Sequence, residues 1–413
     1  MKNYPFTASL AFFFIFSLAP ACAEVFRYQF SEGDNYRINS TVTETVMDDR
    51  VLHHSAEITN RITVTVSDVR PATTDTRSSA KYDCTFMTSE KNSSKTFSWG
   101  REYQSVFRRT DLGVMDITDE YFMPVVRNVP TFPERDIKKG ETWTGNGEEA
   151  HDFRDYFGIA KPFKVPFTVT YTYEGPVQKE GKNLHLIQAE YTLFYDAPAS
   201  AKPSAGAKAA SSDYPVTTMG YSKQHIYWDN DLGLIPFYDE VFRIQLQLSS
   251  GRIIEYNGSA NATVVDTKLM DRNKIVKEMN DEITRMGIKD TSASATENGV
   301  TLSLENIQFE ADSPNLLPSE KEKIIKLAAL LERYPDKELL ISGHTALAGT
   351  AASRQKLSEQ RAEAVARFLV EKGVRNDYNV YTRGFGAEKP IAPNDTEENR
   401  ARNRRVEITI LEK

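Results

Sequence analysis

The chain has 413 residues with 51 basic and 58 acidic side chains, which gives a formal net charge of −7. This length exceeds what one ordinary hydrophobic core organises, so we expect two or three domains. A mildly acidic balance gives no general reason to expect nucleic acid or an anionic membrane surface as a partner.

Residues 1–23 have the pattern of a secretory signal peptide. Lys2 provides a positive start, the run Ala8–Leu18 is uncharged and rich in Phe and Leu, and Ala21-Cys22-Ala23 places small residues where a signal peptidase cleaves. The apolar run is shorter than the ~20 residues that span a bilayer. We therefore expect cleavage after Ala23 and export. Lipid attachment at Cys22 is the alternative, although the preceding residues lack the bulky aliphatic side chain usual before a lipidated cysteine.

Cleavage after Ala23 leaves Cys84 as the one cysteine of the mature chain. One thiol cannot form an intramolecular disulfide, so we expect the exported protein to be stabilised by packing alone. We expect Cys84 itself to be a small, half-buried core residue in a strand.

Residues 24–265 alternate between apolar and polar side chains, and Gly-containing turn signals separate the runs. The alternation is clearest in residues 36–46, 61–66, 163–173 and 242–248. One apolar face and one polar face per strand is typical of an antiparallel sheet that is buried on one side. We therefore predict an all-β antiparallel domain, either a sandwich or a curved sheet, in the periplasm.

The same alternation also occurs in strands that span an outer membrane. Three features argue against that interpretation here. Residues 120–160 are charged and irregular, the alternating runs differ in length and spacing, and Tyr and Phe are scattered rather than gathered into girdles. We therefore favour a sheet outside the membrane.

A helical connector is predicted to follow the β region. Apolar residues recur at three- and four-residue steps from Leu269 to Met286, charged side chains lie opposite, and Gly287 ends the pattern. Residues 290–299 are polar and rich in Ser, Thr and Ala, which suits a linker. We expect residues 266–296 to join two domains, with the helix packed on one of them.

From residue 297 to residue 413, strand-like and helix-like patterns alternate. Val300 to Phe309 is predicted as an apolar strand, Pro318 opens a helix, and Leu339 to Ile341 is predicted as a second strand. A long helix to about Lys372 and two further strands complete the region. This order predicts a small sheet with helices on one face, so the whole chain is a multidomain α+β protein.

Five short motifs occur in order within this region. They are Phe309-Glu310-Ala311-Asp312-Ser313, Ile341-Ser342-Gly343-His344-Thr345, Leu357-Ser358-Glu359-Gln360-Arg361-Ala362, Gly384-Phe385-Gly386 and the run from Asn394 to Glu407. Together these motifs resemble the OmpA-like domain, which is shared by outer-membrane proteins, peptidoglycan-associated lipoproteins and flagellar stator proteins. The resemblance covers the C-terminal quarter of the chain and implies an α/β sandwich there.

The resemblance also implies non-covalent binding of the peptidoglycan stem peptide at its diamino acid. This ligand carries an ammonium and a carboxylate side by side, so its site needs an acceptor-only anion and a bidentate cation at fixed spacing. The family uses an Asp directly after Gly-His-Thr and the Arg of its Leu-Ser-x-x-Arg-Ala motif. Arg361 matches that Arg, and Thr345 and Arg404 match positions beside the pocket. Ala346 stands where the family has the Asp, and Arg354 stands where it has an Asn.

The alanine leaves three interpretations open. An alanine cannot accept a hydrogen bond from an ammonium, and loss of one arm of a charged clamp typically costs ~2–5 kcal/mol. Asp312, in the loop that rims the pocket in the family, rebuilds the contact in the first interpretation. In the second, the peptidoglycan recognised is chemically different from the usual kind. In the third, the domain no longer binds the wall and serves as a structural or protein-contact module.

No motif in the sequence indicates catalysis or a cofactor. There is no Gly-rich phosphate loop, His-Glu-x-x-His, Gly-x-Ser-x-Gly or paired-Cys motif, and the 6 histidines form no cluster with metal-ligand spacing. We therefore predict a non-enzymatic cell-envelope protein of the periplasm and outer membrane, without a metal or cofactor. It is either a peptidoglycan-associated tether or a periplasmic carrier or assembly scaffold whose C-terminal domain no longer binds peptidoglycan.

Overall fold

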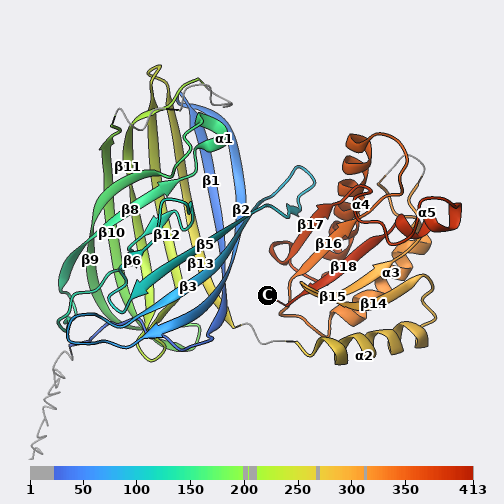
Figure 1. Ribbon diagram of the computed structural model, residues 1–413, viewed down its shortest axis with the longest axis horizontal. Coiled ribbons are helices and arrows are strands. Elements are labelled where there is room, and N and C mark those ends of the chain that lie inside the picture. The colour runs from blue at the N-terminus through green and yellow to red at the C-terminus, as the bar shows by residue number, and fades with distance from the viewer. Residues whose placement is uncertain (1–22, 199–202, 204–211, 267–269, 311–313, 413) are drawn as a thin grey trace, which may run out of the picture.

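A computed structural model describes residues 23–198, 203, 212–266, 270–310 and 314–412. It places a large curled β-sheet beside a smaller α/β unit (Figure 1). We refer to these as the β domain and the C-terminal domain. Most of the predicted signal segment, including Cys22, lies outside the described residues. Within the described ranges, no helix combines the length and apolar character needed to cross a membrane.

The β domain is a twelve-stranded sheet with the order β6-β5-β3-β2-β1-β13-β12-β11-β10-β9-β8-β7, antiparallel at each pairing. Its strands are β1 (Asn35–Asp48), β2 (Val51–Arg70), β3 (Ser79–Glu90), β5 (Arg101–Thr110), β6 (Met115–Asp116), β7 (Val126–Arg127), β8 (Thr142–His151), β9 (Phe163–Lys179), β10 (Lys182–Asp196), β11 (Pro215–Asp229), β12 (Leu234–Leu248) and β13 (Ile253–Asp266). The short helix α1 (Arg154–Phe157) lies between β8 and β9. The prediction of an all-β antiparallel domain is confirmed.

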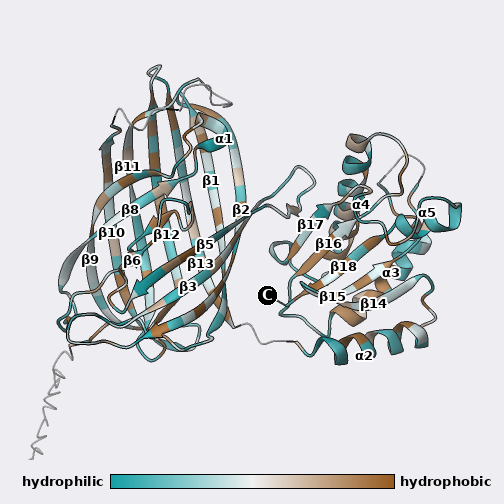
Figure 2. Ribbon diagram, in the orientation of Figure 1, coloured by the Kyte–Doolittle hydropathy of each residue, from teal (hydrophilic) through white to brown (hydrophobic). Residues whose placement is uncertain are grey.

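The period-two pattern explains why these segments form strands with one buried face. In β9, Phe163, Val165, Phe167, Val169 and Tyr171 are all buried, and the residues between them are more exposed. Alternating side chains of a strand point to opposite faces of the sheet, so the apolar set packs inward. Figure 2 shows the resulting alternation of hydrophobic and hydrophilic segments along the strands.

The sheet curls so strongly that its two edges approach each other. Its edge strands β6 and β7 are joined by residues 117–125 alone, although they lie at opposite ends of the strand order. The backbone N–H of Met115 in β6 also donates a hydrogen bond of 2.7 Å to Oδ1 of Asn128, just after β7. The curl encloses an interior, and part of this interior is filled by an aromatic cluster that includes Phe26, Phe132 and Trp228.

The C-terminal domain is built on a six-stranded mixed sheet with the order β14-β15-β18-β16-β17-β4. Its elements in chain order are β4 (Phe97–Ser98), α2 (Arg272–Arg285), β14 (Thr291–Thr296), β15 (Gly299–Leu304), α3 (Pro318–Leu331), β16 (Leu339–Gly343), α4 (Ala351–Glu371), the short 3₁₀ helix η2 (Asp377–Asn379), β17 (Val380–Gly384), α5 (Glu397–Asn403) and β18 (Val406–Leu411). Alternate strand residues such as Leu339 and Ile341 share one core with the apolar faces of α2, α3 and α4. This agrees with the predicted small sheet and its layer of helices.

The region expected to be a polar linker belongs to this sheet instead. Residues 291–296 form β14, which pairs antiparallel with β15, and Ala293 is buried in the core. The polar composition suits an edge strand, because only Ala293 faces the core while the flanking Ser292 and Ser294 are exposed. The preceding helix α2 packs Ile275, Met279 and Ile283 into the same core.

The other face of the C-terminal sheet packs against the β domain. The connection between β3 and β5 carries β4, which pairs in parallel with β17 through Tyr381 opposite Phe97. Phe97, Met87, Leu340, Tyr381 and Leu411 form a buried cluster at this junction. A segment of the β domain thus completes the C-terminal sheet.

Three buried charged side chains lie at the same junction. Glu338 forms ion pairs with Arg37 at 3.3 Å and with Arg61 at 2.6 Å, and these side chains are 2%, 3% and 8% exposed. Nδ2 of Asn39 donates a further hydrogen bond of 3.0 Å to Glu338. The sequence pattern placed Arg37 and Arg61 on the polar side of their strands; that side is covered here by the C-terminal domain.

Candidate functional site

A shallow pocket of about 290 Å³ lies where β16 ends against α4 and α5. It is lined by Thr345, Ala346, Ala348, Ser353, Arg354, Leu357, Arg361, Glu397, Arg400 and Arg404. Five of the positions singled out from the sequence therefore meet at one place: Thr345, Ala346, Arg354, Arg361 and Arg404. The sixth, Asp312, lies outside the described residues.

The end of β16 holds this pocket close to α4. A Cβ atom at Gly343 would lie 2.0 Å from the carbonyl oxygen of Ser358, so only glycine allows the helix to approach the strand this closely. Beyond the strand, the backbone N–H of His344 donates to the carbonyl of Arg405 at 3.0 Å, and that of Thr345 donates to Gly386 at 2.7 Å. These contacts fix the backbone that carries Thr345 and the following alanine.

Arg361 is the least compensated charge of the pocket. Its guanidinium lies 4.8 Å from the ring centroid of Phe309, and its Nε is buried without a hydrogen-bond partner among the described residues. Burial lowers the pKa of Arg361, and the nearby charge of Arg404 lowers it further. A guanidinium that is partly desolvated in this way gains from an anion that reaches it.

The other arginines of the pocket have partners that sequence reasoning did not assign. Glu397, in the first turn of α5, accepts a hydrogen bond of 3.0 Å from Arg400 and one of 2.7 Å from Arg404. The side chain of Arg354 donates to the carbonyl of Gly349. The sequence feature that could have identified Glu397 as a pocket residue is its position within the motif from Asn394 to Glu407, seven residues before Arg404.

The neutral positions complete the chemistry of the pocket. Oγ1 of Thr345 is buried without a hydrogen-bond partner in the described part of the chain. Ala346 is 5% exposed and offers no acceptor. Among the lining residues, the carboxylate of Glu397 is already shared by two arginines. The arrangement therefore favours an anion with hydrogen-bond acceptors over an ammonium.

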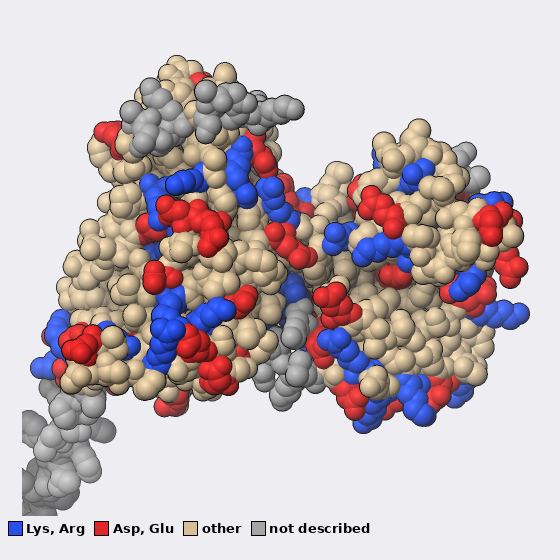
Figure 3. Space-filling view, in the orientation of Figure 1, with Lys and Arg blue, Asp and Glu red and all other residues tan. Residues whose placement is uncertain are grey.

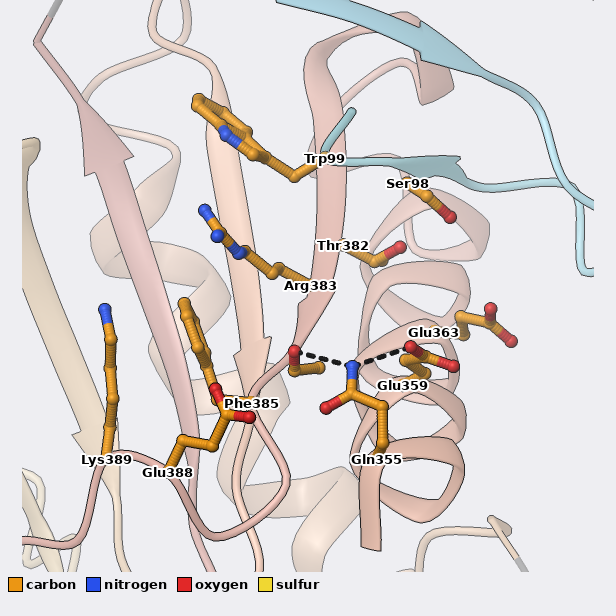
Figure 4. A pocket seen from close by; sticks show the side chains of 11 residues that line it. Ser98, Trp99, Gln355, Glu359, Glu363, Thr382, Arg383, Phe385, Glu388 and Lys389 are labelled. Carbon is orange, nitrogen blue, oxygen red and sulfur yellow. Dashed lines mark hydrogen bonds between the residues drawn. The ribbon is translucent and has the colours of Figure 1, made fainter. Parts of the chain in front are cut away.

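A second pocket, of about 600 Å³, lies at the junction of the two domains (Figure 4). Trp99 follows β4, and Thr382 and Arg383 come from β17, while Glu359 and Glu363 come from α4. Its lining carries charges of both signs. Nε2 of Gln355 donates to Glu359 at 2.7 Å and to the carbonyl of Gly384 at 3.0 Å (Figure 4). Across the visible face of both domains, basic and acidic side chains are interspersed rather than separated by sign (Figure 3).

The region that contains the first pocket is similar to proteins of a known family. Residues 308–404 match the model of the OmpA family. Peptidoglycan-binding protein ArfA of Mycobacterium tuberculosis is 41% identical over 104 residues, which are 25% of this chain and 32% of that protein. Probable lipoprotein YiaD of Escherichia coli is 35% identical over 126 residues, 30% of this chain and 57% of that protein. Outer membrane protein A of Bordetella avium is 44% identical over 104 residues, 25% of this chain and 53% of that protein.

Each match covers only part of this chain and only part of the relative. The chain spans between 32% and 57% of the length of these relatives, and they in turn match 25–30% of this chain. The likeness therefore describes one domain.

Proposed function

Given that residues 308–404 form an OmpA-family domain, we propose that the chain is a non-enzymatic cell-envelope tether that associates with peptidoglycan in the periplasm, close to the outer membrane. The relatives include a protein named for peptidoglycan binding and an outer-membrane protein. The pocket beside β16 is the part of the chain that we assign to the wall.

The observation that carries this proposal is the state of Arg361. Its Nε is buried and has no partner among the described residues, and it faces a pocket that Thr345 and Arg404 also line. A buried cation without an anion is costly, and the negative charge of a ligand carboxylate would offset that cost. We therefore assign Arg361 to the carboxylate of the stem-peptide diamino acid.

Ala346, in place of the aspartate of the family, changes how the proposed site would hold its ligand. At Ala346 no acceptor meets the ammonium of the ligand, so the domain holds one end of the diamino acid instead of two. Truncating one partner of a charged contact typically costs ~2–5 kcal/mol, and every ~1.4 kcal/mol is a factor of ten in affinity. We propose that wall binding is retained but weakened, and that it tolerates stem peptides whose ammonium is modified.

Co-sedimentation of the chain from residue 24 with insoluble peptidoglycan sacculi tests this assignment. We expect the unmodified chain to pellet at micromolar wall concentrations, and Arg361→Ala to reduce the bound fraction by at least tenfold. Arg367→Ala is the matched control, because it removes a guanidinium from the same helix outside the lining of the pocket. Equal loss in both variants would show that the effect is general electrostatics.

A gain-of-function variant separates weak binding from none. We expect Ala346→Asp to increase binding, because the aspartate supplies the missing acceptor for the ammonium. If the unmodified chain and Arg361→Ala both stay in the supernatant while Ala346→Asp pellets, the domain has lost wall binding and the carrier or scaffold alternative replaces the tether.

A further inference from the structure

The interior of the β domain contains a cavity of about 490 Å³ that the wall-binding pocket does not explain. This volume lies within the ~300–1,000 Å³ typical of small-molecule sites. Strands from most of the curled sheet contribute to its walls, and residues 123–126 with Val129 and Pro130 cover it where the two edges meet. The cavity is thus part of the architecture of the sheet and is not a gap between loops.

The lining of the cavity is mainly apolar. Ile58 and Ile62 of β2, Phe86 of β3, Ile226 of β11 and Phe242 of β12 all face it. The aromatic cluster around Trp228 fills a neighbouring part of the interior and limits how far the cavity extends. An occupant therefore needs an apolar body that replaces water over these walls.

Carboxylates are set into this apolar wall without any basic partner in the lining. Glu44, Glu149 and Glu240 line the cavity, and its lining includes no Lys, Arg or His. Glu240 of β12 stands opposite Gln224 of β11 and opposite Ala260 of β13 in the sheet register, so it projects from the middle of the wall. Glu149 is buried, and Glu44 and Glu240 are half-buried. Carboxylates removed from water in this way cost free energy unless a cation or hydrogen-bond donors reach them.

The protein supplies hydrogen-bond donors to only some of the carboxylate oxygens in the cavity. Oε1 of Glu240 accepts hydrogen bonds from Oγ of Ser222 at 2.6 Å and from Nε2 of Gln224 at 3.3 Å. Glu149 accepts from the hydroxyl of Tyr191 at 2.8 Å, and its other oxygen lies 3.0 Å from Nε2 of His151, which stands outside the lining of the cavity. No described residue donates a hydrogen bond to Oε2 of Glu240, which leaves that oxygen for an occupant.

Electrostatics point in the same direction as the geometry. Burial raises the pKa of Glu240, and the negative charge of Glu149 raises it further, against the hydrogen bonds from Ser222 and Gln224. A positive charge between these two carboxylates would relieve both effects, whereas a further carboxylate would add to them.

We propose that the cavity of the β domain binds an amphiphile with an apolar chain and a primary ammonium head, and that Glu240 receives the ammonium. The chain of the ligand lies along Ile226, Phe242 and the other apolar residues of the wall. Anionic amphiphiles of the same length are rejected, because their carboxylate would meet Glu149 and Glu240 in a poorly solvated place. This inference is independent of wall binding by the C-terminal domain.

Calorimetric titration with three probes of equal chain length tests the proposal. Dodecylamine, dodecanol and dodecanoate are each titrated into the chain from residue 24, below their critical micelle concentrations and at neutral pH. We expect dodecylamine to bind at least tenfold more tightly than dodecanol, and dodecanoate to bind more weakly than either. Equal affinities, or tightest binding of dodecanoate, would overturn the proposal.

Two variants, one for the test and one as its control, locate the head group. We expect Glu240→Gln to weaken dodecylamine binding at least tenfold and to leave dodecanol binding unchanged. Glu190→Gln is the matched control, because Glu190 lies on the exposed face of β10, two strands from β12, where it pairs with Lys223. If Glu190→Gln weakens dodecylamine binding as much as Glu240→Gln does, the amine binds the outer surface and the proposal fails.

A third variant fills the cavity and does not rely on charge. Ala260→Phe introduces a ring beside Glu240, and we expect it to abolish binding of both dodecylamine and dodecanol. Circular dichroism and thermal unfolding establish that this variant is folded; if it is not, Val42→Leu adds a smaller group on the opposing position of β1. Unchanged binding in a folded filled variant would place the ligand elsewhere and overturn the assignment.

Discussion

Replacement of Glu338 by Gln tests the energetics of the domain junction most directly. Glu338 receives Arg37 and Arg61 from the β domain, and all three side chains are at most 8% exposed. Gln keeps the shape and one acceptor oxygen but removes the negative charge, which leaves two buried guanidiniums without an anion. Burial already lowers the pKa of Arg37, and the charge of Glu338 opposes that effect.

The expected magnitude follows from the cost of breaking a buried ion pair. Removal of one partner from such a pair typically destabilises a protein by about 3–5 kcal/mol, because the remaining charge is buried without compensation. The domains can limit this loss by separating, since separation returns both guanidiniums to water. We therefore expect Glu338→Gln either to lower the free energy of unfolding by about 3–5 kcal/mol or to undock the domains.

Two measurements on the same samples distinguish these outcomes. Urea denaturation of the chain from residue 24 reports the loss of stability, and small-angle X-ray scattering reports an increase in the radius of gyration if the domains separate. Glu282→Gln is the matched control, because Glu282 also pairs with two arginines, Arg285 and Arg333, but at the surface. Exposed pairs contribute little. If Glu338→Gln changes neither stability nor dimensions beyond Glu282→Gln, the junction is not held by this charge cluster.

Three further predictions concern single residues. Gly343→Ala should destabilise the C-terminal domain and reduce sacculus binding together, because its Cβ would lie 2.0 Å from the carbonyl of Ser358; thermal unfolding and co-sedimentation measure the two effects, and a stable variant with normal binding would contradict the argument. Hydrogen bonds from Arg243 are the main cause that lowers the pKa of Glu255 from 4.5 to about 2, so this carboxylate stabilises the protein above pH 4.5 and the contribution is lost as the pH falls toward 2. The stability advantage of the unmodified chain over Glu255→Gln should therefore shrink across that range in acid denaturation, and a constant difference would refute the assignment. Burial raises the pKa of Cys84 to about 12, so its thiol should react with Ellman's reagent only after unfolding, and rapid reaction of the native chain would show that the β domain opens.

The β domain was predictable where burial follows one strand at a time. The run from Phe163 to Tyr171 has its apolar residues inside, as its period-two pattern requires. The same period-two rule would have placed Glu240 on the inner face of β12. Glu240 lies two residues before Phe242 on that face, while Val241 between them is 50% exposed. A single sequence gives no sign that the apolar face encloses a cavity, since that depends on how far the sheet curls.

The junction was not predictable, because its partners are far apart in the chain. Arg37 alternates with apolar residues and so matches a solvent-facing position, yet it is buried against Glu338. The two residues of β4 are too few to show any periodicity, and their partner β17 begins at Val380. In the C-terminal domain, by contrast, the ordered motifs identified the pocket residues that the fold brings together, and the role of Glu397 required the geometry.

The added strand β4 has a consequence for how the two domains can act together. Without the β domain, the C-terminal sheet would expose Leu340, Tyr381 and Leu411 together with the unpaired edge of β17, a combination that invites aggregation. The C-terminal domain is therefore not an independent module joined by a flexible connection. If the cavity and the pocket beside Arg361 bind ligands as proposed, the two ligands would lie at a fixed distance and orientation, and the proposed tether would act as a rigid spacer between them.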